Sequence, residues 1–198
     1  DMRERLLDRV ALEADLRVAL VAGEVVPWFQ PVVDLNTGRM TGVEALARWP
    51  KDGTLVSPGV FVPLAEQSSL ITLLGRQMLR AACGHAAQWN QHGSLSLSVN
   101  LSAVQLASED LVDQVREALA DSGLSPQRLV LEITETVLME DAETVGPRLS
   151  ALRAMGVRIA LDDFGTGYSA LGYLRKIPVD IVKIDRSFVA DIHEGARQ

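Results

Sequence analysis

A regular alternation of short apolar runs and longer amphipathic segments after residue 94 constrains the fold most. Short runs rich in Val, Ile and Leu, separated by brief loops, predict buried strands joined by helices. This alternation implies a parallel sheet with helices outside and right-handed crossovers, and therefore the α/β class. Strands are predicted over 95–102, 129–135, 157–163 and 180–185, and helices over 109–121, 142–155 and 169–176, with SFVADI beginning a further helix.

The first half of the chain predicts a hairpin followed by two helices. Apolar runs over 25–35 and 39–49 flank an Asn-Thr-Gly turn, which is typical of a β-hairpin. Two prolines in the first run place that strand at an edge or in an irregular position. A loop is predicted over 51–59, and helices over 58–66 and 71–91.

The segment 3–22 predicts an N-terminal helix, because Leu12, Leu16 and Leu20 recur every four residues. Two interpretations stay open: a surface helix packed on the domain, or a connector from an upstream domain. We therefore divide the chain into a helix or connector over 1–23 and one domain over 24–198.

Charge and cysteine content narrow the function classes. The net charge of −7 argues against nucleic-acid polymers and against direct contact with an anionic membrane surface. Cys83 is the only cysteine and no apolar run reaches transmembrane length, so we expect a reducing, cytoplasmic location.

The functional signal is positional, because one polar residue lies near the C-terminal end of each successive strand. In an α/β barrel these strand ends converge on one face, where active sites form. We therefore expect these side chains to meet at one site. They are Glu44, Asn100, Glu132, Asp162 and Lys183, with Asp163 directly after Asp162.

Four carboxylates and an amide, without Cys or His, form an all-oxygen ligand set that suits Mg²⁺, Mn²⁺ or Ca²⁺. Four acids exceed what one Mg²⁺ usually takes from protein, so we expect two ions, bridged by Asp162 or Asp163. Two adjacent metals are a known solution for phosphodiester hydrolysis. Lys183 would then lie beside the attacking water or the developing charge.

Two other site types fit the sequence less well. Residues 165–170 match a loose G-x-G-x-x-A fingerprint, and Asp185 follows at the spacing of a ribose-binding acid. However, Asp162 and Asp163 would repel a pyrophosphate there. A serine nucleophile is disfavoured because the sequence has no G-x-S-x-G elbow.

Five ordered motifs resemble the EAL family of cyclic-di-GMP phosphodiesterases. They are WFQPVVDLNTG with GVEALARW, SVNLS, LEITE, LDDFGTGYSAL and VDIVKIDRSFV. The resemblance implies a TIM-like (β/α) barrel with one antiparallel strand near its start. It also implies that two Mg²⁺ or Mn²⁺ ions hydrolyse one phosphodiester of cyclic-di-GMP to linear pGpG, in bacterial second-messenger signalling.

The resemblance also implies a role for each matching residue. Lys183 resembles the lysine that contacts the nucleophilic water, with Asp185 as a supporting acid. Glu135 resembles the glutamate that steadies the loop containing Gly165, Thr166 and Gly167 and couples it to a dimer interface; a helix-start acid is its other interpretation. The same resemblance gives one metal the ligands Glu44, Asn100, Glu132 and Asp162, and the second metal the ligands Asp162 and Asp163. It gives the substrate the contacts Gln30, Leu46 and Arg48.

The family's last two strands and a further metal-ligating Glu have no counterpart in the sequence. We therefore expect a C-terminally incomplete barrel and an active parent protein, with weak binding and no hydrolysis by this chain alone. The alternative function is a catalytically inactive cyclic-di-GMP receptor. A homodimer and an upstream GGDEF or sensor domain are expected from the resemblance, and such a domain could tether the parent to a membrane.

Overall fold

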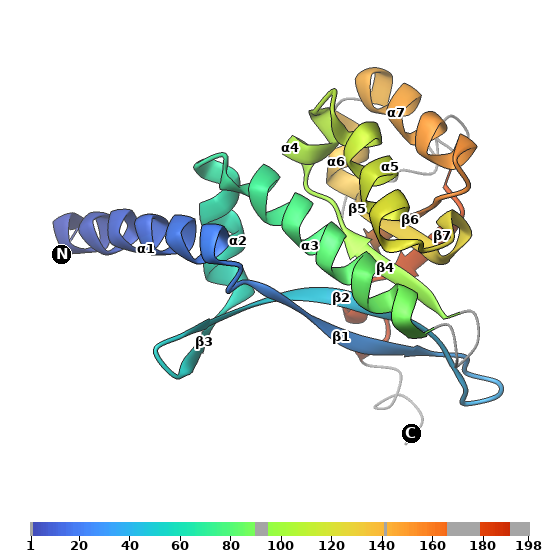
Figure 1. Ribbon diagram of the computed structural model, residues 1–198, viewed down its shortest axis with the longest axis horizontal. Helices are drawn as coiled ribbons and strands as arrows, with labels where there is room; N and C mark the ends of the chain where they lie inside the picture. The colour runs from blue at the N-terminus through green and yellow to red at the C-terminus, as the bar shows by residue number, and fades with distance from the viewer. Residues whose placement is uncertain (1, 90–94, 141, 166–178, 191–198) are drawn as a thin grey trace.

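One twisted sheet organises the chain in the computed structural model, which describes residues 2–89, 95–140, 142–165 and 179–190 (Figure 1). β1 is antiparallel to β2, and the pairings that lead from β2 through β4, β5 and β6 to β7 are all parallel. The α/β class and the single antiparallel strand near the start are thereby confirmed. The strand order is β1 (Val26–Val33), β2 (Met40–Lys51), β4 (Ser96–Asn100), β5 (Leu129–Thr134), β6 (Arg158–Phe164) and β7 (Ile181–Ile184).

The central strands are buried and the outer strands are open. In β5, LVLEIT is buried at every position except Thr134, which is typical of a parallel strand covered on both faces. Gly42 allows β2 to approach β4 closely, because a Cβ there would lie 2.1 Å from the Ser96 Oγ. Among the described strands β1 and β7 are the two edges, so the sheet is not closed, in agreement with the incomplete barrel predicted from the sequence.

Three helices cover the outer face of the sheet: α3 (Leu70–Gln88), α5 (Leu111–Ser122) and α7 (Ala142–Ala154) (Figure 1). Their apolar faces share a core with the strands, including Leu97, Leu131 and Ile159, which are fully buried. This layer leaves the opposite face of the sheet to the site residues.

A second, smaller core joins α1 (Met2–Ala22) and α2 (Pro58–Gln67) to α3. Trp49 and Phe61 pack edge to face there, with ring centroids 5.8 Å apart. Leu16 and Leu20 of α1 are buried in the same cluster, while the start of the helix projects away from the body (Figure 1). None of the described helices is long and apolar enough to cross a membrane.

The prediction of a loop over 51–59 is wrong in part, because β3 (Thr54–Val56) lies within it and pairs with the end of β2. Asp52 and Gly53 both have positive φ, at 49° and 77°, as a two-residue hairpin turn with an Asp-Gly sequence requires. The short helix α4 (Ala103–Ala107) and the 3₁₀ turn η2 (Pro126–Arg128) were also not predicted.

Two strand-to-helix boundaries differ from the expectation. The predicted strand 129–135 ends at Thr134, and Glu135 begins α6 (Glu135–Glu140). The described start of the helix predicted at SFVADI is the 3₁₀ turn η3 (Arg186–Phe188), and the rest of that predicted helix, after residue 190, lies outside the described residues. The helix predicted over 169–176 lies outside the described residues.

Candidate active site

Three carboxylates from three different strands meet on the inner face of the sheet. Glu44 lies on β2, Glu132 on β5 and Asp162 on β6, and one carboxylate oxygen from each lies within 4.8 Å of the other two. Asn100 of β4, between β2 and β5, donates its amide Nδ2 to Glu44 Oε1 at 2.9 Å. The structure thus brings together the four side chains that the resemblance assigns to one metal.

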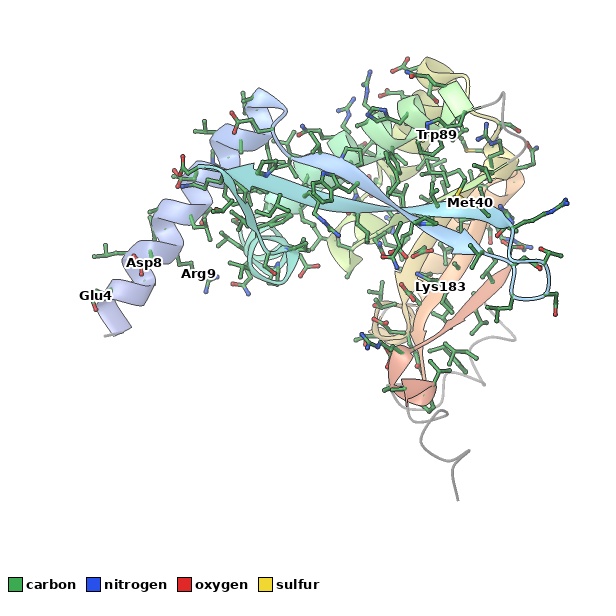
Figure 2. All side chains as sticks on the ribbon, turned by 90° about the horizontal axis from the view of Figure 1, so that it is seen from below. Glu4, Asp8, Arg9, Met40, Trp89 and Lys183 are labelled. Carbon is green, nitrogen blue, oxygen red and sulfur yellow. The ribbon has the colours of Figure 1, made fainter. Side chains whose placement is uncertain are left out.

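Lys183 of β7 places its ammonium among these carboxylates. Its Nζ donates to Glu132 Oε2 at 2.5 Å, Asp162 Oδ2 at 2.8 Å and Glu44 Oε2 at 3.2 Å. Figure 2 shows Lys183 on one side of the β1–β2 hairpin and Trp89 on the other, so the helix layer and the site occupy opposite faces.

Burial and the neighbouring charges shift pKa values in opposite directions at this acidic cluster of Glu44, Glu132 and Asp162. Burial raises the pKa of Glu132, and the hydrogen bond from Lys183 only partly offsets that effect. Burial also disfavours the charged form of Lys183, but its hydrogen bonds to Asp162 and Glu132 outweigh burial and raise the pKa of the ammonium. A single ammonium among three carboxylates leaves net negative charge in a partly dehydrated site.

The donor set fits a hard divalent cation. Oxygen ligands lie roughly 2.0–2.6 Å from Mg²⁺ or Ca²⁺, so two ligands of one ion are at most about 5 Å apart. The separations within the cluster meet that limit. The net negative charge that remains after Lys183 is counted also matches a divalent cation.

Asp163 is turned relative to Asp162 by an irregularity in β6. The register with β7 shifts between Leu161 and Phe164, and Asp163 adopts a φ of 53°. Left-handed backbone at a non-glycine residue costs about 1–3 kcal/mol and clusters at functional sites. The backbone therefore bends at Asp163 itself, directly after Asp162. Burial, with the negative charges of Asp162 and Asp185, raises the pKa of Asp163.

Gly165, directly after Phe164, is tied to the start of α6 through Glu135. Gly165 donates its backbone N–H to Glu135 Oε2 at 3.1 Å, and Glu135 is buried at the first position of α6. Glu135 is therefore both a helix-start acid and the acceptor for the Gly165 N–H, while its role in coupling the loop to a dimer interface stays a prediction. Gly165 has a φ of 101°, and a Cβ there would lie 2.7 Å from the Phe188 ring, so glycine is required. Thr166 and Gly167 lie outside the described residues.

Asp185 has a local structural partner. It caps η3 by accepting hydrogen bonds from the backbone N–H and the hydroxyl of Ser187, and these bonds lower its pKa. Its charge nevertheless acts on Asp163, whose pKa it helps to raise. The supporting-acid role of Asp185 stays a prediction.

The predicted substrate contacts share a face with Glu44. Gln30 pairs directly with Glu44 across β1 and β2, and Leu46 and Arg48 follow Glu44 at two-residue intervals. Alternate strand residues point to the same side, so these side chains line the mouth of the cluster. The Arg48 guanidinium donates to the Ala47 carbonyl at 2.8 Å.

A mostly apolar cavity of about 320 Å³ adjoins the cluster. Leu46 and Arg48 line it from β2 and Asn100 from β4, and the rest of its wall comes largely from α2 and α3. Asn100, which donates to Glu44, therefore also borders this apolar cavity.

Two residues of this region were not singled out in the sequence. Ser98 hydrogen-bonds to Glu132, and the Trp28 ring lies beside the Arg48 guanidinium, 5.8 Å from ring centroid to Cζ. Ser98 lies two residues before Asn100, and Trp28 lies two residues before Gln30. Because alternate residues of a strand point to the same side, the sequence could have placed both beside the predicted site.

Comparisons with known proteins agree with this geometry. Protein y4lL of Sinorhizobium fredii is 46% identical over 93% of this chain and 22% of its own length. The bifunctional diguanylate cyclase/cyclic di-GMP phosphodiesterase MucR of Pseudomonas aeruginosa is 44% identical over 96% of this chain and 28% of its own length. The chain spans about a quarter of the length of the curated relatives it matches.

The chain is also similar in structure to solved EAL proteins. The PaMucR phosphodiesterase in complex with c-di-GMP has a TM-score of 0.86 at 45% identity, covering 91% of this chain and 74% of that chain. The FimX EAL domain of Pseudomonas aeruginosa bound to c-di-GMP has a TM-score of 0.83 at 26% identity, covering 96% and 76%. The profile of the family described as EAL domain matches residues 13–198, which include every residue of the acidic cluster, so the chain belongs to the EAL domain family.

Proposed function

We propose that this chain is the metal-dependent part of a phosphodiesterase that hydrolyses one phosphodiester bond of cyclic-di-GMP to linear pGpG. The observation that carries the proposal is the convergence of Glu44, Glu132 and Asp162 on one point, with Asn100 beside them. The likeness to the PaMucR phosphodiesterase, which was solved in complex with c-di-GMP, supports the choice of substrate.

Glu44, Asn100, Glu132 and Asp162 would hold one divalent cation, Mg²⁺ or Mn²⁺. Asp163, with Asp162 as the shared ligand, would contribute to a second. Cations bound in this way polarise phosphoryl oxygens and lower the pKa of water.

The chain's own residues supply binding and orientation. Arg48 would bind the phosphate from the mouth of the cluster, because a planar guanidinium can donate two parallel hydrogen bonds to phosphate oxygens. The Lys183 ammonium lies within hydrogen-bond distance of all three carboxylates, so it would orient the attacking water beside the cation and neutralise charge on the phosphate. The water oxygen bonds to phosphorus, the bond from phosphorus to the 3′-oxygen breaks, and that oxygen receives a proton, which leaves a 5′-phosphate on pGpG.

The test is incubation with cyclic-di-GMP and Mg²⁺ or Mn²⁺, with product separation by chromatography. The expected product is pGpG, and Asp162→Asn should abolish it. Asp121→Asn is the matched control, since Asp121 forms only a surface ion pair with Arg80 in the described part of the chain. Absence of pGpG from a longer form that contains the whole domain, or full activity of Asp162→Asn, would overturn the proposal.

A second candidate function is a cyclic-di-GMP receptor without hydrolysis. Lys183 favours it, because its ammonium already pairs with all three carboxylates and partly neutralises the cluster without a metal. Calorimetry in EDTA distinguishes the two. Tight nucleotide binding without metal and without turnover would favour the receptor.

We further propose that the parent protein works in the cytoplasm as a homodimer, with a GGDEF or sensor domain upstream. The name of MucR, a bifunctional diguanylate cyclase and phosphodiesterase, supports a cyclase domain as the upstream partner. Light scattering of the longer protein tests the dimer.

A further inference from the structure

Trp28 is an exposed aromatic residue next to the candidate active site. Its exposed fraction is 50%, whereas Trp49 is 1% exposed inside the second core. Trp89 packs edge to face on Phe29, with ring centroids 4.8 Å apart, and lies on the helix side of the hairpin (Figure 2). Trp28 is therefore the one described tryptophan that presents its ring on the open face of the sheet.

The register places Trp28 at the mouth of the cluster. Trp28 pairs with Leu46 and Gln30 pairs with Glu44, so all four side chains lie on one face. Because a strand rises about 3.3 Å per residue, Trp28 lies roughly 7 Å along β1 from Gln30. β1 runs antiparallel to β2, so this displacement leads away from Glu44 in the direction of Arg48.

A cation lies directly over the indole. The Arg48 Cζ is 5.8 Å from the Trp28 ring centroid, within the range of a cation–π contact. The guanidinium also donates a hydrogen bond to the Ala47 carbonyl at 2.8 Å, which holds it near the ring. An anion-binding group and a flat aromatic surface are thus adjacent at the entrance to an acidic site, which is the pairing that a nucleotide phosphate and its base require.

We propose that Trp28 is a base-stacking platform: its free ring face binds one purine base of a cyclic dinucleotide, while Arg48 binds the adjoining phosphate. This inference rests on the proposed function and adds a residue that determines preference for the nucleobase. Stacking of one base on an aromatic side chain contributes about 1–3 kcal/mol by alanine substitution, which corresponds to about 5- to 150-fold in affinity.

The first arm of the test compares two phosphodiesters in a form that contains the whole domain. Cyclic-di-GMP carries purines, and bis(p-nitrophenyl) phosphate carries none. Trp28→Ala should lower the ratio of kcat/KM for cyclic-di-GMP to kcat/KM for the aryl ester by about 5- to 150-fold, mainly through KM. Trp28→Phe should recover most of the ratio, and Trp89→Phe should leave it unchanged. An unchanged ratio in Trp28→Ala would overturn the proposal.

The second arm needs no turnover and so separates failure of this inference from failure of the proposed function. Cyclic-di-GMP should quench tryptophan fluorescence of the wild-type protein and of Trp89→Phe, and quenching should be lost in Trp28→Phe. If the wild-type protein shows this quenching but no hydrolysis, the stacking platform stands and the catalytic proposal fails. Quenching that persists in Trp28→Phe, or none in the wild type, would overturn the platform.

Discussion

Replacing Lys183 by Met should destabilise the metal-free protein. Its ammonium bonds to three carboxylates, of which the Glu132 side chain is 2% exposed, Glu44 19% and Asp162 21%. Removing one partner of a buried pair costs about 3–5 kcal/mol, whereas an exposed pair contributes about 0–1 kcal/mol. With one buried and two partly exposed carboxylates, we expect the free energy of unfolding to fall by about 2–4 kcal/mol.

Urea denaturation in EDTA measures this loss. With an m-value of about 2 kcal/mol/M, the midpoint should move down by about 1–2 M. Lys51→Met is the matched control, because Lys51 pairs only with the exposed acids Asp15 and Asp52 among the described residues, and its midpoint should hardly move. Adding Mn²⁺ should restore much of the stability of Lys183→Met, because a cation at the cluster replaces the lost charge.

A second substitution tests the physical cause. Combining Lys183→Met with Glu132→Gln removes the buried carboxylate that the lysine had neutralised, so the double variant should be more stable than Lys183→Met alone. If Lys183→Met is as stable in EDTA as Lys51→Met, the ammonium does not stabilise the acidic cluster and the electrostatic reasoning is wrong.

Three further predictions concern residues around the site and the core. Burial opposes ionisation of Asp180, but hydrogen bonds from Arg153 and from the Ile159 N–H outweigh it and lower its pKa. Because the pKa of Asp180 is lower in the folded than in the unfolded protein, its ionised form stabilises the fold above the unfolded pKa, and this stabilisation is lost as pH falls through the folded pKa. Asp180→Asn should therefore lower the free energy of unfolding by about 1 kcal/mol at pH 7 and by little near pH 2, as measured by urea denaturation. Burial raises the pKa of the Cys83 thiol to about 12, so a thiol reagent at pH 8 should label it only after unfolding, and rapid labelling of the native protein would contradict its burial. Glu135→Ala should accelerate hydrogen exchange of the Gly165 amide, since that N–H loses its acceptor, and unchanged exchange by NMR would show that the bond does not hold the loop.

The sequence predicted the parts of the structure that repeat with a simple period. The parallel sheet, the hairpin and the meeting of Glu44, Asn100, Glu132 and Asp162 follow from alternation and from the rule that strand ends converge. The short strand β3 was missed although its Asp-Gly turn is a local signal that could have been read.

Other features depend on tertiary contacts that no period reveals. The left-handed conformation of Asp163 arises from the register shift between β6 and β7, and aspartate has no intrinsic need for it. Burial of Glu135 under the loop at Gly165 likewise depends on packing between segments thirty residues apart. For Trp28 the period of two gives the face, which it shares with Gln30, but not the exposure of its ring, because apolar residues on strands are more often buried.

The most direct measurement is the rate of pGpG formation from cyclic-di-GMP as free Mn²⁺ is titrated from EDTA upward, in a form that contains the whole domain. With Glu44, Glu132 and Asp162 as ligands, the rate should be zero in EDTA, rise with Mn²⁺ to saturation, and stay near zero throughout the titration for Glu132→Gln. Hydrolysis that persists in EDTA, or a Glu132→Gln titration that matches the wild type, would show that this cluster is not the metal centre of the reaction.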